Sequence, residues 1–558
     1  MVEHDTTLVA AVVVLAAVLP ACRGRRPAAC ADDVYVNGRI RTVDGSPGIV
    51  EAMAIREGRF LAVGGGKAVL EHRCDSTRVH DLGGRAVIPG LIDSHGHVLS
   101  LGLESTMLDL RGIRSPAEVA SLVAERAKGS EEGAWILGRG WDQTLWEGGE
   151  FPDRGILDGA APRNPVLLRR VDGHAAWVNT RALEAGGVGR DTPDPEGGRI
   201  LRAEGGEPSG ILLDAAADEI MTKVPKPTPG QKAEAIERAG RRCLASGLTM
   251  VHDAGVDRDT LEVLRSLAGE GKLPMRVYAM LSWDDPERDA VLSGGRVEVG
   301  GRLWLRAVKL VADGALGSRG ASLLEPYADD PGNSGILVMD PGDLREAIES
   351  IVERGFQPAV HAIGDRAVRN VLDIYEDVLR ERPGQDLRLR IEHAQVVALE
   401  DIPRIGRLGV IASMQPTHAT SDMRWAEDRL GPVRIEGAYA GRKMMAGGAA
   451  IAAGSDFPVE PPDPLFGIHA ALTREDRTGS PRGGWRPGER MTIDEALRSF
   501  TIEGARASFT EAILGSIEAG KLADFVVLED DIFSMEAARI HEARVAMTVV
   551  GGKVAYSR

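Results

Sequence analysis

Histidines with the spacing of metal ligands follow an apolar segment near the start of the chain. His95 and His97 stand two apart in PGLIDSHGH, and side chains two apart on a strand point to the same face. Imidazole and carboxylate groups are the ligands that Zn²⁺ and similar ions use at open catalytic sites. A structural pair of histidines is the commoner explanation for such a pair alone, so further ligands are needed.

Four more residues are candidates for these further metal ligands. Lys309 lies within the apolar segment LRAVKLV, where a buried ammonium must be paired, deprotonated or modified. His361 and His393 follow two other apolar segments, and Asp456 follows another in GSDFP. Either histidine alone is more often a hydrogen-bonded core residue. All six residues together predict a metal site.

The elements that must position these residues are alternating strands and helices over residues 89–510. Strands separated by amphipathic helical stretches are typical of βαβ units, and eight of them predict a (β/α)8 barrel, a TIM-like α/β fold. Active sites of such barrels lie at the carboxyl ends of the strands. The predicted strands cover residues 87–97, 166–174, 248–253, 303–313, 357–364, 387–395, 409–415 and 449–456.

The two ends of the chain differ from this middle part. Residues 32–88 and 511–558 contain short β-branched runs broken by Asn-Gly, Glu-Gly and Gly-Gly pairs, which are hairpin signals. We expect both ends to meet in one small β-sandwich domain.

Residues 1–31 are expected to be a leader. The apolar run at 8–21 has the length of a signal-peptide core and is too short to span a bilayer. Leu19-Pro20-Ala21-Cys22 resembles a bacterial lipobox that would attach a lipid to Cys22, and Ala29-Cys30-Ala31 is a second cleavage pattern. Both predict an exported protein of the cell envelope, lipid-anchored, periplasmic or secreted. A mis-called start codon would instead leave it in the cytoplasm.

Composition excludes some partners. The net charge of −16 disfavours nucleic acid, whose phosphates repel an acidic chain. Four cysteines are too few for a disulfide framework, and Cys74 and Cys243 are expected as buried thiols.

Longer motifs surround the candidate ligands: GWD at 140–142, DGHAAWVN at 172–179, VKLVADGALGSR at 308–319 and SMQPTH at 413–418. With them, the sequence resembles the amidohydrolase superfamily, in the amidohydrolase-3 or YtcJ-like branch that includes N-substituted formamide deformylases. The resemblance implies one or two divalent metals such as Zn²⁺. One would be held by His95, His97, Asp456 and a carboxylated Lys309, and the other by that Lys309, His361 and His393. With one metal, Lys309 would stay a plain lysine and pair with Asp313.

The expected reaction is hydrolysis of a non-peptide C–N bond in a small amide, N-substituted formamide or N-acyl amine. Hydroxide generated at the metal would attack the carbonyl, and Asp456 would pass the water's proton to the leaving nitrogen. His174, on the predicted second strand, is a catalytic candidate that would orient the carbonyl, or a structural partner of Asp172. The predicted substrate-binding residues, each of which also has a structural explanation, are His174, Trp141, Trp177, Arg319 and His418.

Other functions stay open at this point. The same ligands would serve a mononuclear deaminase or a hydrolase of cyclic amides or esters. A catalytically silent exported binding protein on a barrel scaffold is a further alternative, because the barrel fold alone does not decide function. The resemblance also suggests a homodimer.

Overall fold

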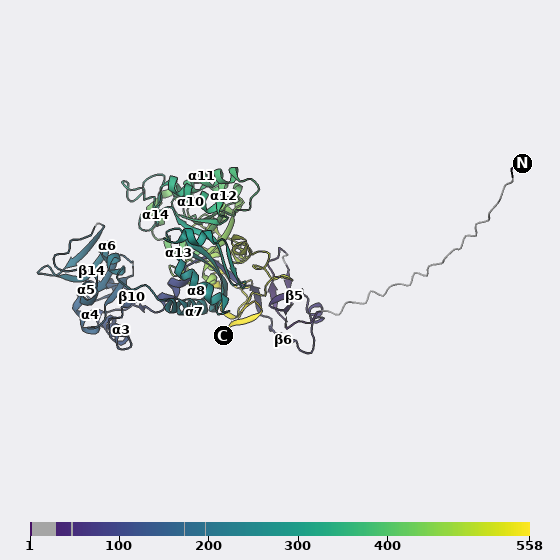
Figure 1. The fold of residues 1–558 in the computed structure, drawn as a ribbon, viewed down its shortest axis with the longest axis horizontal. Helices are drawn as coiled ribbons and strands as arrows, with labels where there is room; N and C mark the ends of the chain where they lie inside the picture. The colour runs from purple at the N-terminus through teal and green to yellow at the C-terminus, as the bar shows by residue number, and fades with distance from the viewer. Residues whose placement is uncertain (3–28, 46–47, 172, 196) are drawn as a thin grey trace.

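The computed structural model describes residues 1–2, 29–45, 48–171, 173–195 and 197–558. Most of the predicted leader, including Cys22, lies outside these residues. The described chain has three parts, which Figure 1 shows side by side: a lobe, a central barrel, and sheets built from the chain ends. Within the described ranges, no helix is both long and apolar enough to cross a membrane.

Strands from both chain ends form two sheets. These strands are β1 (Asp33–Val36), β2 (Arg39–Arg41), β3 (Ile49–Val50), β4 (Ala52–Arg56), β5 (Arg59–Gly64), β6 (Arg78–Asp81), β7 (Ala86–Pro89), β23 (Phe525–Leu528), β24 (Val545–Val550) and β25 (Lys553–Ser557). The sheet orders are β5-β4-β1-β6 and β25-β24-β23-β7-β2-β3. Antiparallel pairing of β23 with β7 joins the two ends directly. Side chains of both sheets share one core, in which the rings of Tyr35 and Phe525 lie 5.1 Å apart.

The barrel has eight parallel strands in the order β22-β21-β20-β19-β18-β16-β15-β8, and a bridge between Gly96 and Phe457 nearly closes it. Most of their residues are buried, as expected of parallel strands covered by helices. The strands are β8 (Leu91–Gly96), β15 (Leu248–Val256), β16 (Arg276–Ser282), β18 (Leu303–Val311), β19 (Gln357–Ala362), β20 (Arg390–His393), β21 (Ile411–Met414) and β22 (Ala450–Ala453), with β17 (Val297–Val299) paired to β18 outside this order.

Helices follow the barrel strands and pack their apolar faces on the sheet. In α11, for example, Val368, Val371, Leu372 and Tyr375 recur at helical spacing and are buried. The helices are α2 (Val98–Glu104), α7 (Pro229–Ala245), α8 (Arg258–Gly269), α9 (Arg288–Ser293), α10 (Pro341–Glu353), α11 (Asp365–Glu381), α12 (Ile402–Arg407), α13 (Pro416–Asp422), α14 (Ala426–Arg434), α15 (Gly441–Ala446), α16 (Pro464–Thr473), α17 (Ile493–Ser499) and α18 (Ile502–Ala507).

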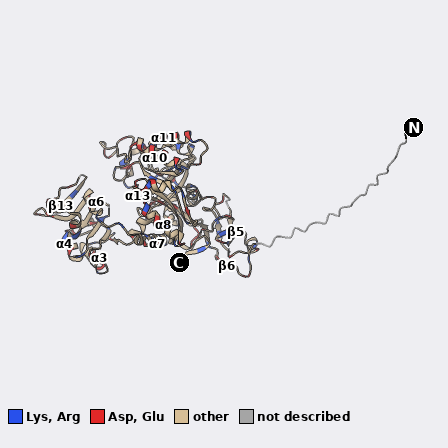
Figure 2. Ribbon diagram, in the orientation of Figure 1, with Lys and Arg blue, Asp and Glu red and all other residues tan. Residues whose placement is uncertain are grey.

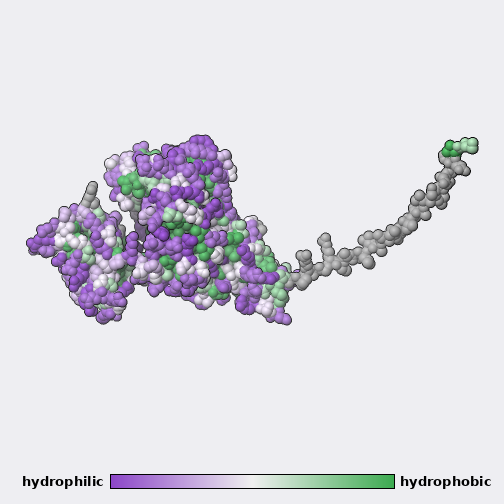
Figure 3. All heavy atoms as spheres, viewed as in Figure 1, coloured by the Kyte–Doolittle hydropathy of each residue, from purple (hydrophilic) through white to green (hydrophobic). Residues whose placement is uncertain are grey.

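A separate lobe is inserted between the first two barrel strands. Its six-stranded sheet has the order β13-β14-β12-β11-β10-β9 and its own hydrophobic core. In Figure 3 a deep gap separates this lobe from the barrel over much of its height. Its elements are β9 (Leu108–Asp109), α3 (Pro116–Lys128), β10 (Ile136–Trp141), α4 (Arg154–Ala160), β11 (Val166–Arg170), β12 (Ala175–Val178), α5 (Thr180–Gly186), β13 (Gly198–Arg202), β14 (Pro208–Asp214) and α6 (Ala215–Met221).

The lobe corrects two of our predictions. Within the second predicted barrel strand, residues 166–174, residues 166–170 are in fact β11 of the lobe, and β16, which we missed, completes the barrel. Residues 89–510 are therefore not a barrel alone. An apolar run predicts a strand, but it carries no information about which sheet the strand joins. Polar residues follow residues 166–170 in the sequence, as they follow the barrel strands. This pattern led us to assign β11 to the barrel.

The cysteine prediction was also wrong in part. Cys30 and Cys74 form a disulfide across 44 residues of sequence, whereas Cys243 is a buried free thiol as expected. The pairing depends on a contact between the two segments, in which the backbone N–H of Ala31 donates to the carbonyl of His72. Spacing along the chain does not reveal such a contact.

Charged residues of both signs occur in all three parts, and the visible side shows no continuous basic stripe (Figure 2).

Candidate metal centre

All six predicted ligands line one cavity of about 620 Å³ at the carboxyl ends of the barrel strands. They come from β8 and the residue after it, from β18, from the ends of β19 and β20, and from the segment after β22. These residues are His95, His97, Lys309, His361, His393 and Asp456. Their convergence is the arrangement that the barrel predicts.

The imidazole and carboxylate groups stand close enough to share a metal ion. Donor atoms of His95, His393 and Asp456 lie within 4.8 Å of one another. Oδ1 of Asp456 lies 3.0 Å from Nε2 of His97 and 3.6 Å from Nε2 of His95. The rings of His361 and His393 are 4.6 Å apart.

Tight backbone packing fixes the first and eighth strands together. A Cβ at Gly96 would meet the Phe457 ring at 2.4 Å, and one at Gly454 would meet the backbone N of His95 at 2.6 Å. The buried Asp93 carboxylate accepts hydrogen bonds from the backbone N–H groups of His95 and Ser455 and from the Ser455 hydroxyl. These contacts hold His95 and Asp456 at a short separation.

Two of the candidate ligand residues adopt a backbone conformation that residues other than glycine rarely adopt. The φ angles of His393 and Asp456 are 74° and 60°, in the left-handed region that is costly for residues other than glycine. The surrounding fold holds them there, as is common at functional sites.

A buried carboxylate that the sequence analysis missed orients His95. Glu392 accepts a hydrogen bond from Nδ1 of His95 at 2.6 Å, and the Arg390 guanidinium donates to it at 2.8 Å. Arg390 also lies 3.0 Å from Nδ1 of His252 and donates to the carbonyl of Ser94. Fixing Nδ1–H in this way directs Nε2 of His95 toward the cavity. The signal was present in the sequence, since Arg390 and Glu392 stand two apart on β20.

The hydrogen bonding and protonation of the other histidines also suit metal binding. Nδ1 of His393 lies 2.8 Å from Oε1 of Gln415, whereas Nε2 of His361 and Nε2 of His418 are buried without a hydrogen-bond partner. Burial lowers the pKa of His361 to about 3 and that of His95 to about 4. At neutral pH both imidazoles are neutral, which is the form that binds a metal.

Lys309 is 9% exposed, and its ammonium makes no hydrogen bond or ion pair with any described residue. Burial lowers its pKa to about 8. The alternative partner we considered, Asp313, instead accepts hydrogen bonds from the backbone N–H groups of Ser322, Ile363 and Gly364. The Lys309–Asp313 pair, which we considered only for a site with one metal, is therefore not formed.

Asp456 is ionised in this setting. Burial acts to raise its pKa, but the hydrogen bond with His97 and the nearby histidines outweigh burial and hold the pKa well below its usual value. Its second oxygen, Oδ2, lies 4.0 Å from Nε2 of His418. The carboxylate can therefore accept a proton inside the cavity.

His418 is the predicted substrate-binding residue that lines this cavity. It comes from α13 and its ring stacks with His393 at 6.3 Å. Apolar side chains, including Leu316, Trp425 and Val459, form much of the remaining wall. The site thus has a polar floor and a largely apolar entrance.

The structure does not bring His174 and the tryptophans to this site. His174 lies in the lobe, next to β12, with Nδ1 at 2.8 Å from Asp214, and its side chain is 64% exposed. Trp141 and Trp177 are fully buried in the lobe core, where their rings contact each other at 6.3 Å. Placing His174 on the second barrel strand was wrong because that strand belongs to the lobe.

Arg319 is likewise placed away from the cavity wall. It donates to Asp329 at 3.2 and 2.9 Å, and it is not among the residues that line the metal cavity. Its guanidinium secures the loop after β18.

Comparison with known proteins agrees with this geometry. Residues 78–556 match the amidohydrolase family. The chain is 38% identical over 540 residues to Protein LONG AFTER FAR-RED 3 of Arabidopsis thaliana, covering 94% of this chain and 92% of that protein. It is 34% identical over 520 residues to the putative amidohydrolase YtcJ of Bacillus subtilis, covering 91% and 96%. It is 28% identical over 545 residues to the N-substituted formamide deformylase of Arthrobacter pascens, covering 94% and 98%.

Solved structures show the same architecture. An uncharacterized metal-dependent hydrolase from Pyrococcus horikoshii superposes with a TM-score of 0.78 at 30% identity, over 90% of this chain and 99% of that one. A second, from Pyrococcus furiosus, gives a TM-score of 0.76 at 33% identity, over 89% and 99%.

Proposed function

Because the chain belongs to the amidohydrolase family, we propose that it is a metal-dependent hydrolase of a non-peptide C–N bond. The substrate would be an amide, an N-substituted formamide or an N-acyl amine. Similarity to an N-substituted formamide deformylase supports this bond type.

The observation that carries the proposal is the convergence of possible metal ligands on one cavity, some of which make no hydrogen bond with the protein. Nε2 of His361 is buried and unbonded, the Lys309 amine has no partner among the described residues, and donor atoms of His95, His393 and Asp456 lie within 4.8 Å of one another. Buried polar groups normally find partners. Imidazole nitrogens and a carboxylate are ligands of Zn²⁺ and related ions, so the residues present fit a divalent metal.

A metal bound here would supply a nucleophilic hydroxide at neutral pH and would polarise the substrate carbonyl. The protein supplies the remaining functions. Glu392 fixes His95, and Gln415 fixes His393, so that both rings hold their orientation. The apolar entrance residues exclude bulk water and hold the uncharged part of the substrate.

Asp456 would move the proton. Its depressed pKa keeps it as a carboxylate that accepts a proton from water. It would then donate that proton to the leaving nitrogen. His418, whose Nε2 is free and lies 4.0 Å from Asp456, would hold the substrate next to this carboxylate.

We further propose that Lys309 reacts with CO₂. The neutral amine would attack the carbon of CO₂ and lose one proton, which would give a carbamate whose oxygens could serve as metal ligands. This reaction would convert a buried cation without a counter-ion into an anionic ligand, which removes the cost of burying the charge.

The test is metal analysis of the purified protein, followed by a screen over N-formyl, N-acyl and cyclic amides and purine or pyrimidine amines. We expect one or two metal ions per chain and release of amine from open-chain amides. Ammonia release from ring amines alone would favour a deaminase. Full metal content with no turnover of any compound would favour a binding protein.

Export remains a proposal, and the disulfide between Cys30 and Cys74 supports it, since disulfides persist mainly in oxidising compartments. Cleavage after Ala31 would remove Cys30 from the mature chain, so we favour the earlier pattern that leaves Cys22 at the new N-terminus. Mass spectrometry of the mature protein from a bacterial envelope tests this. A mature chain that begins at Asp32 would contradict it.

A further inference from the structure

A second, smaller cavity adjoins the metal centre. His393, Gln395 and His418 line both cavities, so the two share a wall. The smaller cavity has about 30 Å³ of space, which is room for about two or three water-sized groups. Most of its other walls are apolar, with Met414, Ile451, Ala471 and Met491 among them.

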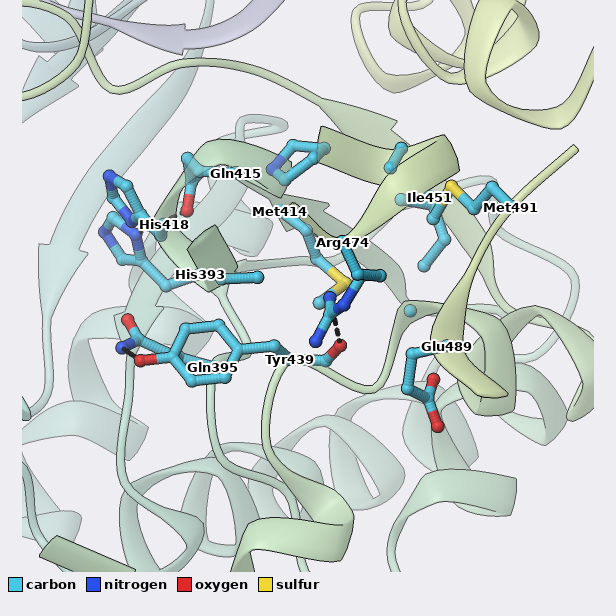
Figure 4. A pocket seen from close by; sticks show the side chains of 14 residues that line it. His393, Gln395, Met414, Gln415, His418, Tyr439, Ile451, Arg474, Glu489 and Met491 are labelled. Atoms are coloured by element: carbon cyan, nitrogen blue, oxygen red, sulfur yellow. Dashed lines mark hydrogen bonds between the residues drawn. The ribbon is translucent and has the colours of Figure 1, made fainter. Parts of the chain in front are cut away.

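A buried arginine without a counter-ion faces this cavity. Arg474 is 5% exposed, and Figure 4 shows its guanidinium between Tyr439 and Glu489. Nε donates to the carbonyl of Trp485 at 3.2 Å and Nη1 to that of Tyr439 at 3.3 Å. Nη2 is buried and has no hydrogen-bond partner. Among the described residues, no carboxylate pairs with Arg474.

The nearest acidic residue in the cavity is already paired. Oε1 of Glu489 lies 2.7 Å from Nζ of Lys443, and Oε2 accepts from the backbone N–H of Lys443 at 3.2 Å. Among the described residues, Arg474 therefore has no ion-pair partner, and its guanidinium lies over the Trp485 ring at 5.1 Å. Burial lowers the pKa of Arg474 to about 10, although the nearby Glu489 carboxylate acts to raise it. An unpaired buried charge is costly unless a ligand compensates it.

We infer that the small cavity is a subsite for a carboxylate of the substrate, bound by Arg474. The inference rests on the proposed function and narrows it. A carboxylate matches the planar donor fork of a guanidinium and the size of the cavity. The shared wall of His393 and His418 places it next to the reacting amide. The substrates are then N-formyl or N-acyl compounds whose carboxylate is joined to the amide by a short chain.

The binding test uses the metal-loaded full chain. Straight-chain carboxylates from acetate to hexanoate, and their primary amides, are titrated by calorimetry into the wild type and Arg474→Gln. We expect the best carboxylate to lose about 10- to 100-fold in affinity in this variant, the range expected for loss of charge-assisted hydrogen bonds. The matched amide should bind both proteins equally.

Two further variants separate the subsite from general effects. Arg477→Gln removes the same charge from an exposed residue three positions away and should bind carboxylates like the wild type. Ala471→Leu fills the cavity but keeps Arg474, and it should weaken carboxylate binding as strongly as Arg474→Gln. Metal content and thermal stability of each variant check that the fold is kept.

The kinetic test compares N-acyl compounds that carry a carboxylate with their uncharged amide analogues. Arg474→Gln should raise KM for the charged substrates about 10- to 100-fold and leave the uncharged ones unchanged. An equal rise in KM for charged and uncharged substrates, or unchanged carboxylate binding in Arg474→Gln, would overturn the proposed subsite. The hydrolase proposal would still stand. No turnover of any amide, with carboxylate binding that still depends on Arg474, would instead reject the hydrolase proposal.

Discussion

The barrel and the lobe both have polar residues at the ends of their parallel strands, but only the barrel brings them to a common point. In the barrel, strands from β8 to β22 surround one axis, so residues at or just beyond the ends of five of them line a single cavity. In the lobe, β10 and β11 lie in an open sheet. Their strand ends therefore spread along an edge, where His174 is exposed beside Asp214.

The two regions also use aromatic residues differently. Trp141 and Trp177 fill the core of the lobe, whereas Trp425 lines the entrance to the metal cavity. Closure of a sheet into a barrel thus determines whether histidine and tryptophan residues form a site or only stabilise the fold. The following predictions test this contrast, from the largest effect to the smallest.

Asp456→Asn should reduce kcat by about 10³-fold, the scale of general acid–base catalysis. The amide cannot accept the proton, but the histidines remain, so metal content should stay near that of the wild type. Steady-state kinetics and metal analysis measure both quantities. Asp284→Asn, at an exposed position, is the control. A turnover close to that of the wild type would exclude Asp456 from proton transfer.

Trp141→Ala should destabilise the lobe by about 3–5 kcal/mol, the cost of removing a large buried side chain. Calorimetry should show the lobe unfolding at lower temperature while the metal stays bound to the barrel. Leu145→Ala, whose side chain is 47% exposed, should change stability little. Loss of the metal together with the lobe would show that the two regions are one cooperative unit.

Glu392→Gln should weaken metal binding by about 10- to 100-fold, because partners that orient a ligand histidine contribute on this scale. Competition with a chelator measures the affinity. Glu400→Gln, on the exposed surface eight residues away, provides the comparison. Unchanged affinity would mean that the backbone alone orients His95.

Lys309 gives a pH-dependent prediction. Its pKa of about 8 lies below that of a free lysine, so the neutral amine that reacts with CO₂ increases as pH rises toward 8. Reactivation of metal-free protein with Zn²⁺ and bicarbonate should be about fivefold slower at pH 7 than at pH 8. Lys309→Met should show no response to bicarbonate. A reactivation rate independent of bicarbonate in the wild type would argue against carboxylation.

His174→Gln should change kcat/KM by about twofold or less, since surface substitutions away from a site have small effects. His418→Gln, inside the metal cavity, should be clearly more damaging in the same assay. A larger loss in His174→Gln than in His418→Gln would mean that the edge of the lobe reaches a metal centre, and the contrast between the two regions would fail.

Sequence patterns revealed most of the barrel and its ligands for a local reason. His95 and His97 share a face because strands have a period of two, and the polar residues after apolar runs mark the ends of buried strands. The family resemblance then supplied the ligand set, and the structure brings all six ligand residues to one cavity.

Sequence alone therefore predicted the class of fold, the candidate ligands and the pairing of the two chain ends. Tertiary structure decided that β11 belongs to the lobe and β16 to the barrel, that Glu392 and Arg390 orient His95, and that Arg474 is buried without a counter-ion. The physical reason is that local sequence specifies strands and turns, whereas sheet membership and charge pairing depend on contacts between residues hundreds of positions apart, such as His95 and Glu392.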